Sequence, residues 1–135
     1  MMILGIGTDI VDIKRIEKAL SKGDALAKRV LTEFEWQEFT DCSMQARYLA
    51  KKFASKEAAV KAIGTGIGHG ISWQHIEVIH DELGKPILRA LGAFELWCRE
   101  HQVSSLHISI ADEQDYATAF VIIEAQLNQS TSGTF

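Results

Sequence analysis

Apolar residues recur every three or four positions between residues 47 and 63, which is the spacing of an amphipathic helix. This segment contains no Gly or Pro and is rich in Ala, Leu, Lys and Glu, the residues that favour helix most strongly. The pattern predicts one long helix that ends at Gly64. Glu57 falls on the edge of the predicted apolar stripe, which consists of Leu49, Ala50, Phe53, Ala54 and Val60.

A second apolar run, residues 3–11, is enriched in Ile and Val and predicts a buried strand. Alternation places Gly5, Gly7 and Asp9 on the same face. Glycines within a strand often mark a place where another backbone or a ligand approaches closely. We expect the opposite face to point into the core, since it carries Leu4, Ile6, Thr8 and Ile10.

Two aspartates in this region, Asp9 and Asp12, are each of the residue type that caps a helix. Asp12 suits that role better, because the next helical pattern begins directly after it. Asp9 is then left without a structural role, and an Asp within an apolar strand is unfavourable in itself. We therefore treat Asp9 as a candidate functional residue.

The rest of the chain changes irregularly between helical and strand-like patterns. Thr32 and Glu35 have the spacing of a capping box, and Ser43 is the expected cap of the long helix. Consecutive strand patterns predict a single α+β domain over residues 1–125, with a largely antiparallel sheet packed against the long helix. The polar residues 126–135 are expected to form a disordered tail. The other predicted elements are helices at 14–20, 24–30 and 92–101 and strands at 73–80, 86–91, 104–111 and 116–124.

Composition narrows the classes of function and location. The chain has 135 residues and a formal net charge of −4, so it lacks the overall basicity that favours nucleic acid binding. No apolar run approaches membrane-spanning length, and residues 1–11 lack the basic leader and the apolar core of a signal peptide. Cys42 and Cys98 lie far apart and without metal-ligand spacing, so we expect free thiols in a reducing cytoplasm.

Basic residues are unevenly distributed despite the negative net charge. One group lies near the N-terminus and another lies on the predicted long helix. A basic zone on an acidic protein suits a phosphate-bearing ligand or an acidic partner, and it equally suits ordinary solvated helix faces. The groups are Lys14, Arg15, Lys18, Lys22, Lys28 and Arg29, and then Arg47, Lys51, Lys52, Lys56 and Lys61.

Three polar residues have no evident structural role: Asp9, His107 and Glu57. Glu57 either pairs with Lys61, four residues further along the helix, or acts as a metal ligand or general base. Two carboxylates suit Mg²⁺, which usually binds one or two carboxylates together with substrate phosphates. Lys61 and the glycine-rich residues 64–70 suit the phosphates themselves, although this loop follows a helix, whereas a P-loop precedes one.

Two segments, IGTDIVDIKRIE at 6–17 and FASKEAAVKAIGTG at 53–66, resemble the holo-acyl-carrier-protein synthase family. This family is the short, bacterial type of 4′-phosphopantetheinyl transferase. Neither motif is decisive alone, but the pair is highly specific. The resemblance covers residues 3–124 and includes GISWQHIEV at 70–78, GKP at 84–86 and HISIADEQDYATAFVIIE at 107–124.

The resemblance implies transfer of the 4′-phosphopantetheine group from coenzyme A to a serine of apo-acyl carrier protein, in support of fatty acid biosynthesis. Adenosine 3′,5′-bisphosphate would be the second product. It also implies that Asp9 and Glu57 hold Mg²⁺ against the coenzyme A diphosphate and act in catalysis with Lys61. The implied coenzyme A-binding residues are Lys61, Gly64, Thr65, Lys85 and His107. The implied carrier-protein surface is the basic first helix, with Lys14, Arg15, Lys18 and Lys22.

The family also implies an oligomer. Longer transferases of the superfamily resemble two fused copies of this half-size fold with the site between them, and the short members are homotrimers with sites at subunit interfaces. One departure is that many members carry Ser or Thr, followed by His or Asp, where this chain has Ala111 and Asp112. Two rival interpretations remain: a non-enzymatic module whose basic helices bind an acidic partner, and a metal-dependent nucleotide hydrolase.

Overall fold

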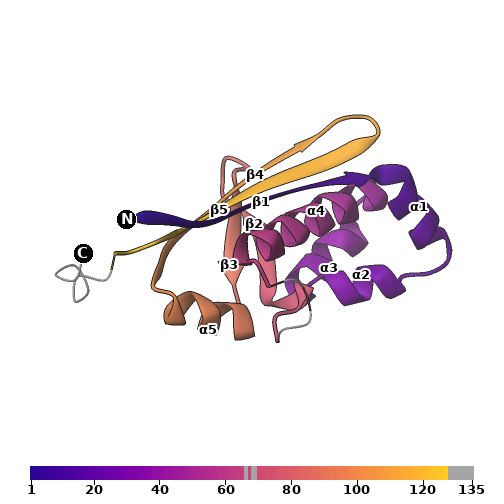
Figure 1. Cartoon of the computed structure of the whole chain (residues 1–135). Coiled ribbons are helices and arrows are strands. Elements are labelled where there is room, and N and C mark those ends of the chain that lie inside the picture. The colour runs from indigo at the N-terminus through magenta and orange to yellow at the C-terminus, as the bar shows by residue number, and fades with distance from the viewer. Residues whose placement is uncertain (66, 68–69, 128–135) are drawn as a thin grey trace.

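A long helix, α4 (Gln45–Ile63), lies along one face of a three-stranded antiparallel sheet (Figure 1). The sheet has β1 (Met2–Asp12) at one edge, β5 (Tyr116–Ala125) in the centre and β4 (Val103–Asp112) at the other edge. This computed structural model describes residues 1–65, 67 and 70–127. The predicted α+β class, with its long helix and antiparallel sheet, is confirmed.

The remaining elements surround α4. A separate antiparallel hairpin follows a 3₁₀ turn at Trp73–His75 and contacts α4 beside the main sheet. No helix among the described residues is long and apolar enough to cross a membrane. The hairpin strands are β2 (Ile76–His80) and β3 (Pro86–Ala90), and the other helices are α1 (Ile13–Ser21), α2 (Ala25–Val30), α3 (Glu33–Asp41) and α5 (Gly92–Glu100).

Strand β1 faces α4 with its glycines, not with its isoleucines. A Cβ atom built on Gly7 would lie 2.0 Å from the carbonyl oxygen of Ala58, and one built on Gly5 would lie 1.9 Å from that of Ala62. The expectation that the other face points into the core is therefore wrong. Ile6 on that face is 59% exposed, because the helix backbone can come this close only to a strand surface without side chains. The expected close approach of a second backbone is confirmed.

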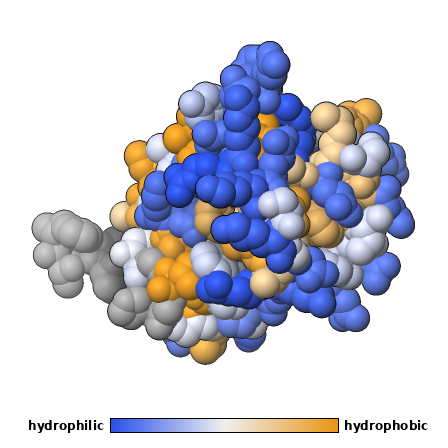
Figure 2. Space-filling model, turned by 90° about the vertical axis from the view of Figure 1, so that its right-hand side faces the viewer, coloured by the Kyte–Doolittle hydropathy of each residue, from blue (hydrophilic) through white to orange (hydrophobic). Residues whose placement is uncertain are grey.

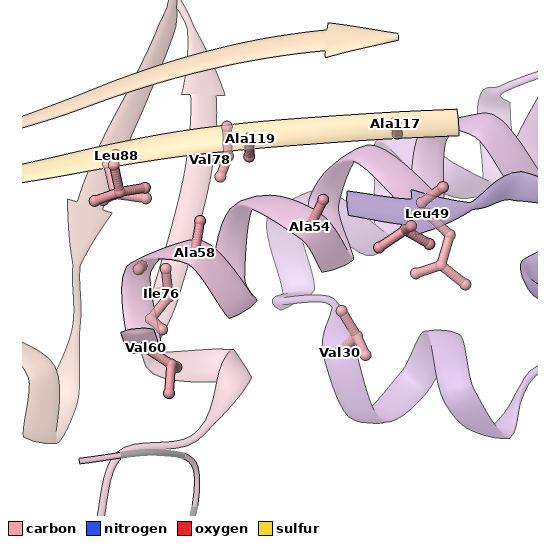
Figure 3. Packing of buried hydrophobic residues seen from close by; sticks show 14 of the residues in the cluster. Val30, Leu49, Ala54, Ala58, Val60, Ile76, Val78, Leu88, Ala117 and Ala119 are labelled. Atoms are coloured by element: carbon pink, nitrogen blue, oxygen red, sulfur yellow. The ribbon is translucent and has the colours of Figure 1, made fainter. Parts of the chain in front are cut away.

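The contact between α4 and the sheet is made largely by small side chains (Figure 3). Ala54 and Ala58 of α4 are fully buried against the sheet, where Ala117 and Ala119 of β5 lie. Short side chains on both surfaces let the helix and the strands lie close together, and close packing maximises their dispersion contacts. Larger apolar groups fill the space to the side, among them Val30, Leu49, Ile76, Val78 and Leu88.

The predicted helix ends are confirmed at three places. The Asp12 side chain caps α1 by accepting a hydrogen bond from the Lys14 backbone N–H at 3.0 Å. Thr32 and Glu35 form both hydrogen bonds of a capping box at the start of α3. Gly64 ends α4 in the left-handed conformation, with φ of 91°.

Two other local predictions are wrong. Met44, not Ser43, is the residue that precedes α4, and it forms no side-chain cap. The strand predicted from residue 73 begins at Ile76, because residues Trp73–His75 form the 3₁₀ turn. Most of the predicted tail, residues 128–135, lies outside the described residues.

We predict that Gly7→Ala lowers the free energy of unfolding by about 3 kcal/mol, because the new methyl group overlaps the α4 backbone. Chemical denaturation monitored by circular dichroism measures this change. Glu82→Ala, at an exposed position of the β2–β3 turn, is the control and should change stability by less than about 0.5 kcal/mol. Equal stability of the two variants would contradict the close β1–α4 contact.

Candidate active site

Asp9 of β1 lies on the side of the strand that faces α4 and forms an ion pair with that helix. Its Oδ1 lies 3.0 Å from the Lys61 Nζ, which also donates to the carbonyl oxygen of Thr8 at 3.1 Å. The Asp9 side chain is 16% exposed and the Lys61 side chain 55% exposed. The pair therefore stands at the edge of the core, where a ligand can reach the ammonium group.

Glu57 of α4 does not pair with Lys61, so the predicted spacing of four residues does not produce a salt bridge. Lys61 reaches Asp9 instead. The Glu57 Oε1 accepts a hydrogen bond of 2.7 Å from the indole Nε1 of Trp73. The sequence interpretation missed Trp73, because an aromatic residue near a glycine-rich loop carries no motif that signals a hydrogen bond to a distant helix.

A cavity of about 390 Å³ opens beside these groups at the C-terminal end of α4. The structure thus brings Asp9, Glu57, Lys61 and Gly64 into one region, with Thr65 next in the chain. A larger depression of about 790 Å³ lies beside α5 and contains neither carboxylate, so chemistry and not volume identifies the candidate site. The residues that line the smaller cavity are Glu57, Val60, Lys61, Gly64 and Ile67.

Two predicted coenzyme A-binding residues lie elsewhere in the chain. His107 is on the sheet face opposite α4, where its Nε2 lies 2.5 Å from Glu124 Oε1. Lys85 is exposed in the β2–β3 turn. His80, at the start of this turn, lines a different cavity together with residues from the first half of α4. Within one chain, neither His107 nor Lys85 contacts the Asp9 carboxylate.

Asp112 is engaged with α4. Its carboxylate lies 2.8 Å from Arg47 Nη1 and 3.8 Å from Lys51 Nζ, so it connects the end of β4 to the start of the helix. Ala111 points to the opposite face of the sheet, in register with Thr118. Ala111 is therefore an exposed methyl group on the sheet surface.

The basic residues fall into two structural classes. The predicted carrier-protein residues of α1 are exposed, and the end of the molecule on the α1 side is mainly hydrophilic (Figure 2). Lys52 and Lys56 of α4 are buried, so solvated helix faces do not account for them. The exposed α1 residues are Lys14, Arg15 and Lys18, with Lys22 following as the C-cap.

A fully buried ion pair lies next to Glu57 in the sequence. Lys56 Nζ is 2.5 Å from Glu35 Oε1 and donates to the Val30 carbonyl oxygen at 2.6 Å. The Glu35 carboxylate also accepts from the backbone N–H groups of Thr32 and Val78, so α2, α3, α4 and β2 meet at this pair. Burial lowers the pKa of Lys56, and the carboxylate of Glu35 acts in the opposite direction.

A family model for the ACPS 4′-phosphopantetheinyl transferase superfamily matches residues 5–121. The chain belongs to this superfamily. Its relatives include the holo-[acyl-carrier-protein] synthase of Alteromonas mediterranea, which is 54% identical over 124 residues, covering 92% of this chain and 98% of the relative. The similarity thus extends over nearly the whole chain.

Solved structures of holo-acyl-carrier-protein synthases have the same fold. The holo-[acyl-carrier-protein] synthase from Neisseria meningitidis is 46% identical and superposes with a TM-score of 0.86, covering 91% of this chain and 99% of that chain. The Bacillus anthracis enzyme, solved in complex with coenzyme A (3′,5′-ADP), is 38% identical with a TM-score of 0.78 over 93% of this chain and 100% of that chain.

We predict that Lys56→Met lowers the free energy of unfolding by about 3–5 kcal/mol, because the Glu35 carboxylate is left buried without its cation. Urea denaturation measures this loss, and adding Glu35→Gln should restore part of it. The control is Lys51→Met, which removes a half-exposed pair of 3.8 Å and should cost less than about 1 kcal/mol. A Lys56→Met loss as small as the control would show that the buried pair does not stabilise the fold.

Proposed function

We propose that the cavity at the end of α4 is the active centre of a holo-acyl-carrier-protein synthase. The enzyme transfers the 4′-phosphopantetheine group from coenzyme A to a serine of apo-acyl carrier protein and releases adenosine 3′,5′-bisphosphate. The observation that carries this proposal is that Glu57 and Lys61 line one cavity and Asp9 forms an ion pair with Lys61, in a chain that matches the transferase superfamily over residues 5–121.

The residues of this site fit a Mg²⁺ ion. Asp9 and Glu57 supply carboxylate oxygens next to Lys61, and Mg²⁺ prefers one or two carboxylates completed by substrate phosphates. Asp9 and Glu57 would hold the ion, which when bound supplies Lewis acidity and neutralises charge on a diphosphate. Among the described residues, no group of three or more His, Cys, Asp or Glu side chains is placed to hold a metal ion, so this proposal rests on the two carboxylates alone.

Lys61 binds phosphate in this proposal. Its ammonium group is half-exposed and held by Asp9 at 3.0 Å, an arrangement weak enough in water to be exchanged for a phosphate oxygen. Gly64 lines the same cavity, and we assign Gly64 and the next residue, Thr65, to the nucleotide part of coenzyme A. Charge stabilisation and positioning account for most of the catalysis of phosphoryl transfer.

The proposed chemistry forms one bond and breaks another at the same phosphorus atom. The serine oxygen of the carrier protein bonds to the phosphorus that bears pantetheine, while the bond from this phosphorus to the bridging oxygen of the diphosphate breaks. The bridging oxygen leaves with adenosine 3′,5′-bisphosphate. Two candidates can accept the serine proton as the oxygen attacks, the Glu57 carboxylate and a bound water molecule.

The acidic carrier protein binds the basic face of α1. This helix begins directly after β1, so Lys14, Arg15, Lys18 and Lys22 stand close in the chain to Asp9 and can orient the incoming serine. We place the enzyme in the cytoplasm, in fatty acid biosynthesis. Free Cys42 and Cys98 suit a reducing compartment, and burial raises the pKa of the Cys98 thiol to about 11, which keeps it protonated.

We predict that apo-acyl carrier protein gains the mass of phosphopantetheine when it is incubated with this protein, coenzyme A and Mg²⁺, as measured by mass spectrometry. Glu57→Gln should abolish the gain while the circular dichroism spectrum and melting temperature stay unchanged. Coenzyme A cleavage without carrier modification would instead support a hydrolase. Undiminished transfer by Glu57→Gln would remove this carboxylate from the mechanism.

The sheet face opposite α4 supports a homotrimer. It carries apolar side chains that are largely exposed in one chain: Ile6 is 59%, Ile10 66% and Phe120 43% exposed. An apolar face of this kind favours contact with another protein surface. His107 lies on the same face, so a second copy seated here places this histidine at a subunit interface. We infer that each site is completed by a neighbouring chain.

We predict a solution mass of three times the 15.0 kDa of one chain in size-exclusion chromatography with light scattering. Ile10→Asp should dissociate the assembly and lower transfer at least tenfold, because it places a charge on the apolar face. Leu83→Asp, at a 95% exposed position in the β2–β3 turn, should leave both mass and transfer unchanged. An active wild-type monomer would contradict the trimer.

A further inference from the structure

The carboxylate of Glu57 is held by an indole and not by a cation. Trp73 Nε1 donates to Glu57 Oε1 over 2.7 Å, at the short end of the normal range for an N–H···O bond. An indole has one N–H donor and no acceptor, so the bond constrains one carboxylate oxygen in one direction. Among the described residues, no ion pair includes Glu57 and no second hydrogen bond to its side chain is formed.

The indole packs beside an aromatic ring and a guanidinium group. The ring of Phe53, one helical turn before Glu57 on α4, lies 5.9 Å from the Trp73 ring between centroids. The guanidinium group of Arg29, from α2, lies 5.6 Å from the same indole. The backbone at Trp73 begins the 3₁₀ turn, in which the Ser72 N–H donates to His75 Nδ1 at 3.1 Å. The donor is therefore fixed in place by the fold before any ligand binds.

Carboxylates that bind metals are in turn hydrogen-bonded by neighbouring groups, as Glu57 is by Trp73. When one oxygen of a carboxylate is hydrogen-bonded, the orientation of the group is set and the other oxygen keeps a defined direction. Partners that orient metal ligands in this way typically change metal affinity or activity by about 10- to 100-fold. The Glu57 side chain also lines the cavity that Lys61 shares, so its orientation bears directly on that space.

We propose that Trp73 is a positioning residue that fixes the Glu57 carboxylate to receive a divalent cation. The inference rests on the proposed function, in which Asp9 and Glu57 hold Mg²⁺. Trp73 contacts neither substrate nor reacting atoms in this assignment and acts only through Glu57. Because Arg29 stacks on its indole, α2 is linked through Trp73 to the carboxylate.

Trp73→Phe tests the proposal, since it keeps an aromatic ring beside Phe53 and removes only the N–H donor and part of the ring. Isothermal titration of Mg²⁺ into the protein saturated with coenzyme A should show a Kd raised about tenfold. Transfer should slow at limiting Mg²⁺ and recover at high Mg²⁺. A purely structural role would lower the melting temperature without moving this Mg²⁺ dependence.

Trp97→Phe is the matched control. Trp97 lies on α5 and stacks on His101 at a centroid distance of 4.2 Å, away from the residues that line the Glu57 cavity. This variant makes the same chemical change and should bind Mg²⁺ with wild-type affinity. An equal rise in Kd for Trp73→Phe and Trp97→Phe would overturn the proposal.

A spectroscopic measurement tests the same contact without depending on whether Trp73→Phe folds well. The chain has three tryptophans, so Trp36→Phe with Trp97→Phe leaves Trp73 as the single indole. Mg²⁺ should change its fluorescence emission in this background, and Glu57→Gln should abolish the change. Unchanged emission on Mg²⁺ binding would contradict a hydrogen bond between Trp73 and a metal-bound carboxylate.

The Glu57→Gln variant separates the two hypotheses. If Glu57→Gln still binds Mg²⁺ and transfers phosphopantetheine, the proposed metal site is wrong. If Glu57→Gln loses both activities while Trp73→Phe keeps the wild-type Kd for Mg²⁺, the proposed function stands and the role of Trp73 is overturned. If Glu57→Gln loses both Mg²⁺ binding and transfer, and Trp73→Phe raises the Kd for Mg²⁺ about tenfold, the results support both the proposed function and the role of Trp73.

Discussion

The close contact between β1 and α4 is the constraint on which the site depends. Gly5 and Gly7 let the strand approach the helix until a Cβ atom would overlap the carbonyl oxygens of Ala62 and Ala58. Asp9 follows two residues later on the same face, so its carboxylate reaches the helix side chain of Lys61. Any larger residue at the glycines would separate the strand from the helix and with it the two halves of the candidate metal site. Gly5 and Gly7 therefore support the candidate site indirectly, because they keep β1 close enough to α4 for Asp9 to reach Lys61.

Much of this arrangement could be predicted from the sequence, because its signals are local. Helical spacing predicted α4, the Thr32–Glu35 pair predicted a capping box, and Gly64 predicted the helix end, and all three are confirmed. The wrong predictions share a different cause. Alternation shows which residues of β1 share a face, but it does not show which face the helix covers. That choice depends on how near two backbones can approach, a property of three-dimensional packing.

The partners of the charged side chains could not be predicted from sequence spacing either, because they lie far away in the chain. A spacing of four residues favours Glu57–Lys61 in an isolated helix by only about 0.2–0.5 kcal/mol, so a tertiary partner such as Asp9 easily displaces it. Trp73 reaches Glu57 across a loop that no periodicity describes. Lys56 was one of several basic residues on the predicted helix, and only the fold reveals that Glu35, from the preceding helix, neutralises it in the core.

Two adjacent residues of α4 have different roles: Lys56 stabilises the fold and Glu57 belongs to the candidate site. Lys56 points into the core, where its ion pair with Glu35 joins α4 to α2, α3 and β2. Glu57, the next residue, lines the cavity and accepts the hydrogen bond from Trp73. Lys61 stands one turn further on at the rim of the same cavity. The buried Lys56–Glu35 ion pair therefore fixes the orientation of α4 about its own axis, and it is inaccessible to a ligand. The charge that anchors the helix is therefore separate from the charges of Glu57 and Lys61, which line the cavity.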